Sequence, residues 1–80
     1  MISLARDDIR FMLDRLELQP DLRSALDGLS QTGGEISDED ADQLRDLCGE
    51  RLQTHGFDQN YELTEEGRRL ESLIDALFTG

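Results

Sequence analysis

Valine and tryptophan are absent from this 80-residue chain, and isoleucine, phenylalanine and tyrosine are scarce. Because β-strands favour β-branched and aromatic residues, this shortage argues against an extensive sheet. The helix-favouring residues Leu, Arg, Glu, Ala and Gln are common instead. The composition therefore predicts an all-α fold, a small four-helix domain in which residues 1–80 form a single unit.

Cysteine occurs only once, as Cys48, so the chain cannot form an internal disulfide, which fits a reducing compartment. The first eight residues lack the basic segment and the apolar run of a signal peptide. No window approaches the roughly 18 consecutive apolar residues that a membrane span requires. These absences predict a soluble, cytoplasmic protein.

Lysine is also absent, and the chain contains eight arginines and 19 acidic residues, which gives a formal net charge of −11. Such a chain repels phosphate groups, so direct binding to nucleic acid or to an anionic membrane is disfavoured. A basic protein partner would instead be attracted and steered towards it. The same acidity also serves simply to keep a small protein soluble, and both interpretations remain open.

The sequence offers no catalytic or cofactor motif, because it has neither a phosphate-binding glycine loop nor a serine in a nucleophile elbow. Cys48 and His55 are the only strong ligands for a soft metal, and two ligands do not complete a tetrahedral zinc site. Seven residues apart on one helix, they lie about 10 Å apart, too far for a thiol to be activated by a base. We therefore expect no enzyme activity, no cofactor and no metal.

Hydrophobic spacing predicts the positions of the helices and of the connections between them. Ser3, Ser37 and Thr64 are the expected N-caps, the second of these forming a capping box with Asp40, and Gly56 is the expected left-handed residue after the third helix. The segment 57–63 is the only stretch expected to be extended, as a short hairpin or turn. The four helices are expected over residues 4–16, from residue 20 to about residue 29, from residue 38 to about residue 55, and from residue 65 to the end at Gly80.

Two surface features are candidates for binding a partner. Glu39, Asp42, Asp46 and Glu50 follow one another at spacings of three, four and four, so they form one acidic stripe on the third helix. Their mutual repulsion costs a few tenths of a kcal/mol per pair, roughly. The stripe is either a solvated face or a docking surface for a basic partner. Phe11 is the second candidate, because a narrow apolar stripe of Leu4, Phe11 and Leu18 either packs in the core or faces a partner or a second copy.

The segment 61–70, with the sequence YELTEEGRRL, resembles the stretch of winged-helix regulators in which the wing strand enters the last helix. The same residues also describe a capped helix with a small residue for close packing. The resemblance implies that the third helix is the recognition helix, but an acidic helix is unsuited to the major groove. It thus implies at most a winged-helix-like fold used for protein contacts.

These observations favour a small bacterial protein-binding module, of the inhibitor or immunity type, that engages a basic partner. Two alternatives remain open. One is a winged-helix-like transcription accessory protein, and the other is a homodimeric structural protein.

Overall fold

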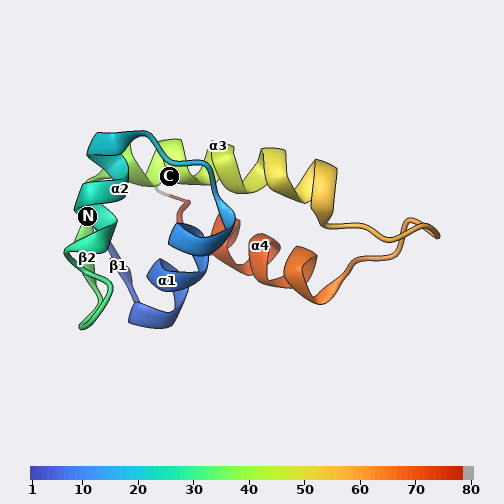
Figure 1. The fold of residues 1–80 in the computed structure, drawn as a ribbon, viewed down its shortest axis with the longest axis horizontal. Coiled ribbons are helices and arrows are strands. Elements are labelled where there is room, and N and C mark those ends of the chain that lie inside the picture. The colour runs from blue at the N-terminus through green and yellow to red at the C-terminus, as the bar shows by residue number, and fades with distance from the viewer. Residues whose placement is uncertain (79–80) are drawn as a thin grey trace.

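The computed structural model describes residues 1–78 and is mostly helical, as the composition predicted, with a short two-stranded sheet in addition (Figure 1). The longest helix, α3, packs most extensively against α4. The elements in chain order are β1 (Ile2–Leu4), α1 (Arg6–Arg15), α2 (Pro20–Asp27), β2 (Gly34–Ile36), α3 (Asp38–His55) and α4 (Glu65–Ala76).

The sheet corrects the prediction that only segment 57–63 would be extended. Strand β1 pairs antiparallel with β2, so that Ile2 lies opposite Ile36 and Ser3 opposite Glu35. Leu4 and Ile36 are buried, which anchors both strands on the helices. Gly33 has a φ of 74°, and a Cβ at this position would lie 2.8 Å from the carbonyl oxygen of Leu4. A glycine is therefore required where the chain enters β2.

Helix α1 is shorter than predicted because strand β1 takes up the residues in front of it. The helix begins at Arg6 with Ala5 as its N-cap, so the assignment of Ser3 as N-cap and of residue 4 as helical was wrong. Helix α2 begins at Pro20 as expected, since proline suits the first turn of a helix. Its last turn ends at Asp27.

One hydrophobic core lies among the helices and is completed by the strands. Most residues expected on the inward faces of the helices are buried or partly buried, but Ala5, Ala25 and Phe78 are exposed. Ala5 lies before the first turn of α1, and Phe78 is 61% exposed because α4 ends at Ala76. The predicted extension of this helix to Gly80 includes residues that lie outside the described part of the chain. The buried core residues are Leu4, Ile9, Met12, Leu16, Leu22, Leu26, Ile36, Ala41, Leu44, Cys48, Leu70, Leu73 and Leu77.

Ser37 caps the start of α3 as predicted, because its hydroxyl accepts a hydrogen bond from the Asp40 backbone N–H at 3.2 Å. This is one of the two hydrogen bonds of the predicted capping box. The end of α3 differs from the prediction. Gly56 has a φ of −84° and is right-handed rather than left-handed. Its hydrogen atom instead faces the side chain and backbone of Leu52, which leave no room for a Cβ.

Residues 57–63 form a hairpin that projects beyond the paired ends of α3 and α4 (Figure 1). A single antiparallel bridge joins Phe57 to Leu63. At the tip, Oδ1 of Asp58 accepts hydrogen bonds from the backbone N–H groups of Asn60 (2.8 Å) and Glu62 (3.0 Å). These bonds hold Tyr61 at a φ of 61°, which is unusual for a bulky side chain.

The hairpin leads directly into α4, just as the wing strand leads into the last helix in the winged-helix regulators that segment 61–70 resembles. Within the described residues, however, strand β2 pairs with β1 and not with the hairpin. Thr64 caps α4 as predicted, because its hydroxyl accepts a hydrogen bond from the Gly67 N–H at 3.0 Å. Across residues 1–78, no helix combines the length and the apolar character needed to cross a membrane.

Candidate functional site

The four acidic residues of the predicted stripe all lie exposed on α3. Asp42 is paired with Arg45 on the same helix, at 3.3 Å between Oδ1 and the guanidinium. The other three, Glu39, Asp46 and Glu50, have no ion pair with any residue from 1 to 78. The outer face of α3 therefore carries carboxylates that the rest of the described chain does not neutralise.

Phe11 lies elsewhere, in the contact between α1 and α4. The guanidinium carbon of Arg69 is 4.8 Å from the centre of the Phe11 ring, and Arg69 also pairs with Asp8 at 3.2 Å. The ring is partly buried and packs against the core. Leu4 and Leu18 lie outside α1, in strand β1 and in the connection to α2, so the three residues do not form one helical stripe as was predicted.

A groove runs beside the acidic stripe, between α3 and the segment that joins α1 to α2. It consists of two adjoining cavities of about 310 and 360 Å³, which share Glu17 and Leu47. The first is also lined by Arg15, Leu16, Glu50, Arg51, Thr54 and His55, and the second by Gln19, Leu22, Gln43 and Asp46. Asp46 and Glu50 therefore belong to both the stripe and the groove, whereas Glu39 and Asp42 lie outside the groove lining.

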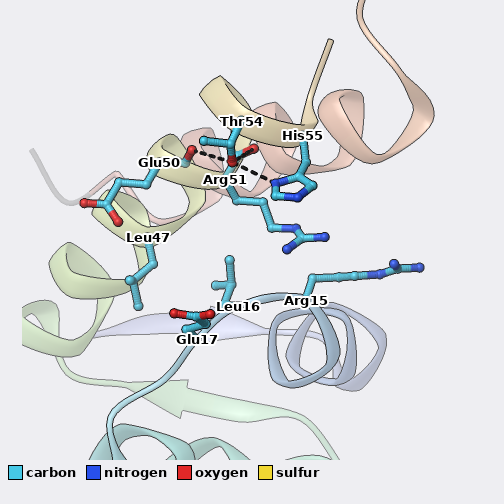
Figure 2. Close-up of a pocket in the computed structure, with 8 residues that line it drawn as sticks. All are labelled: Arg15, Leu16, Glu17, Leu47, Glu50, Arg51, Thr54 and His55. Carbon is cyan, nitrogen blue, oxygen red and sulfur yellow. Dashed lines mark hydrogen bonds between the residues drawn. The ribbon is translucent and has the colours of Figure 1, made fainter. Parts of the chain in front are cut away.

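The groove is divided by charge. Figure 2 shows Glu17, Leu47 and Glu50 towards one end of the first cavity, with Arg15, Arg51 and His55 towards the other. Leu16 and Leu47 supply apolar surface between the charged groups (Figure 2). This arrangement offers carboxylates and aliphatic carbon at one end and the two guanidinium groups at the other.

The cations at the second end are already engaged by a carboxylate of α4. The Glu66 carboxylate accepts two hydrogen bonds from Arg51, at 3.3 Å from Nε to Oε2 and at 3.2 Å from Nη2 to Oε1. This bidentate pair is partly buried. Its Oε1 is also 3.5 Å from the Nε of Arg15. The three residues tie α1, α3 and α4 together, so this end of the groove has a structural role.

Sequence reasoning missed Glu17, because it lies in a connection and faces α3 only after the chain has folded. The missed pair of Arg51 and Glu66 joins residues 15 positions apart. A signal for Leu47 was present, since it lies next to the acidic stripe at helical spacing. Its helical spacing from Leu44 favours a place in the core, but Leu47 is only partly buried and lines both cavities.

Cys48 and His55 occupy unrelated environments. Cys48 is fully buried on the inner face of α3, and desolvation raises the pKa of its thiol from about 9 to about 11. His55 is exposed, and its Nδ1 lies 2.7 Å from the hydroxyl of Thr54. A thiol held neutral and shielded from solvent is a poor nucleophile. Within residues 1–78, no three His, Cys, Asp or Glu side chains are grouped to hold a metal ion.

The raised pKa of Cys48 predicts that the protein loses stability at alkaline pH. Between pH 9 and 11 the thiol ionises in the unfolded chain but stays protonated in the folded one. The unfolded state is then favoured, so the free energy of unfolding should fall by at most about 1.4 kcal/mol per pH unit. Urea unfolding of the wild type and of Cys48→Ala at pH 8 to 11 measures this contribution. Equal slopes for the two proteins would contradict it.

Comparison with known proteins adds no family assignment to this geometry: the chain matches no protein-family model, no curated protein and no solved structure.

Proposed function

We propose that the protein is a small binding module, of the inhibitor or immunity type, that engages a basic protein partner inside the cell. The observation that carries this proposal is the exposed stripe of Glu39, Asp42, Asp46 and Glu50, in which only Asp42 is neutralised by another residue of the described chain. Adjacent carboxylates on one helix repel one another. A partner that supplies Arg or Lys to this face would relieve that repulsion.

The charge of the whole chain supports the same class of partner. With a net charge of −11, the protein attracts cationic surfaces and accelerates their association, most strongly at low ionic strength. The stripe gives this attraction a direction, because α3 is the longest helix and presents the four carboxylates along one side. Binding through this face leaves the core contacts of α3 unchanged.

Charge reversal on the stripe tests the proposal. The triple variant Glu39→Lys, Asp42→Lys and Asp46→Lys should lose capture of basic proteins from a lysate of the native host, while helical content measured by circular dichroism stays unchanged. Capture by the wild type should weaken as salt is raised, because exposed charges are screened.

A matched variant separates the location of the charge from its amount. Glu62→Lys, Glu71→Lys and Asp75→Lys make the same change in net charge at exposed sites away from α3. This control should retain the captured proteins. If both variants lose them equally, only net charge matters and the stripe is not the docking surface.

A further inference from the structure

We infer that the groove between α3 and the α1–α2 connection seats an arginine side chain of the basic partner. The inference rests on the proposed function and deepens it by naming the recognised group and its place. Three acidic residues, Glu17, Asp46 and Glu50, line this groove from two separate segments of the chain. The occupant is therefore held from both sides and not only by the surface of one helix.

The three carboxylates are available for a ligand. None of them has an ion pair with a residue in the part of the chain that the structure describes. The arginines that line the same groove are paired with other carboxylates, Arg15 with Asp14 and Glu66, and Arg51 with Glu66. The acidic end thus lacks an internal counter-charge, while the basic end has one. A cation from a partner would therefore bind at the acidic end of the groove.

The apolar lining selects the kind of cation. Leu16 and Leu47 lie among the charged groups, and Leu22 lines the adjoining cavity. The aliphatic stem of a long basic side chain can cover this surface while its charged end stays near the carboxylates. Arginine fits better than lysine, because its planar, weakly hydrated guanidinium has donors for carboxylates on either side.

The size of the groove fits side chains of a peptide segment. Each cavity lies near the lower limit of about 300 Å³ for small-molecule sites. The two cavities adjoin along α3, so successive basic side chains of one segment can occupy them. The exposed stripe residues Glu39 and Asp42 then steer the partner without entering the groove.

Nuclear magnetic resonance titration of the whole 80-residue chain tests this assignment directly. The probes are a short Gly/Arg peptide with blocked ends, its lysine counterpart and its neutral citrulline counterpart. We expect the arginine peptide to shift the amide signals of segments 16–19 and 43–55, with weaker binding of the lysine peptide and none of the citrulline peptide. Equal binding of arginine and lysine peptides would overturn the choice of arginine.

Two single variants locate the contact. Glu17→Gln should weaken binding of the arginine peptide about tenfold, the usual effect of losing a charge-assisted hydrogen bond. Glu71→Gln removes the same charge from an exposed site on α4 and should change affinity by less than about twofold. Leu47→Ala should also weaken binding severalfold without any change in charge, roughly as expected for lost stem packing.

The outcomes distinguish this inference from the proposed function. If amide shifts centre on residues 39–42, and Glu17→Gln and Glu71→Gln behave alike, the groove is not the site. Stripe-dependent capture of basic proteins would still stand in that case. If the stripe variant and its control capture proteins equally, while the peptide binds as expected, the stripe fails and the groove alone is retained. Absence of peptide binding at low salt would overturn the inference.

Discussion

Replacing Gly67 with alanine should destabilise the protein by about 3 kcal/mol, which is most of the roughly 3–5 kcal/mol expected for a domain of this size. Gly67 is buried in the first turn of α4, where a Cβ would collide with the carbonyl oxygen of Gly56. It would also approach Cδ1 of Leu63 to 2.9 Å. Because the nearest obstacle is backbone, α4 must move away from the end of α3.

That movement would also break a set of hydrogen bonds. The Gly56 carbonyl oxygen accepts hydrogen bonds from the backbone N–H of Thr64 (2.8 Å) and from its hydroxyl (3.1 Å). The same hydroxyl caps α4 at Gly67. Thermal and urea unfolding, followed by circular dichroism, would measure the loss.

The matched control is the same substitution on α3. A Cβ at Gly49 meets no atom within 4 Å, so Gly49→Ala should stabilise the protein by up to about 1 kcal/mol through higher helix propensity. Opposite signs for the two glycine variants are the expected result. A Gly67→Ala variant as stable as the wild type would show that α3 and α4 do not approach as closely as described.

Leu44→Ala should cost about 3 kcal/mol, within the range of 2–5 kcal/mol observed for deletion of a fully buried leucine. Leu44 has no exposed surface and points into the core from α3. Its removal leaves a cavity that rigid neighbouring helices fill only in part. Denaturant unfolding should show a lower midpoint with little change in slope.

Leu47→Ala is the control for this prediction, because it makes the same chemical change one turn further along the helix. Leu47 is only partly buried and borders the groove, so its truncation should cost about 1 kcal/mol or less. The pair therefore separates leucines that hold the fold from the leucine that we assign to recognition. Equal losses of stability would place Leu47 in the core.

The helices could be predicted from the sequence because their signals are local. Pro20, Ser37 and Thr64 mark three helix starts through backbone chemistry that acts within one turn. The inward leucines follow from helical spacing in the same way. The acidic stripe is equally local, since all four carboxylates lie on α3 and need no other element to come together.

The sheet could not be predicted because each of its strands has only three residues, too few for an alternating pattern. Its stability comes from pairing between residues about 30 positions apart, and only Ile2 and Ile36 are β-branched. The groove was missed for a similar reason. Glu17 and Asp46 are neighbours of one cavity only after α1, α2 and α3 have packed.

The hairpin between α3 and α4 has a consequence for the order of folding. It joins two helices that pack together. The first contacts between α3 and α4 therefore close only the short loop of the hairpin, which costs little conformational entropy. Pairing of β1 with β2 must instead close a loop of about 30 residues that contains α1 and α2. We therefore expect the α3–α4 pair to form early in folding and the pairing of β1 with β2 to form late.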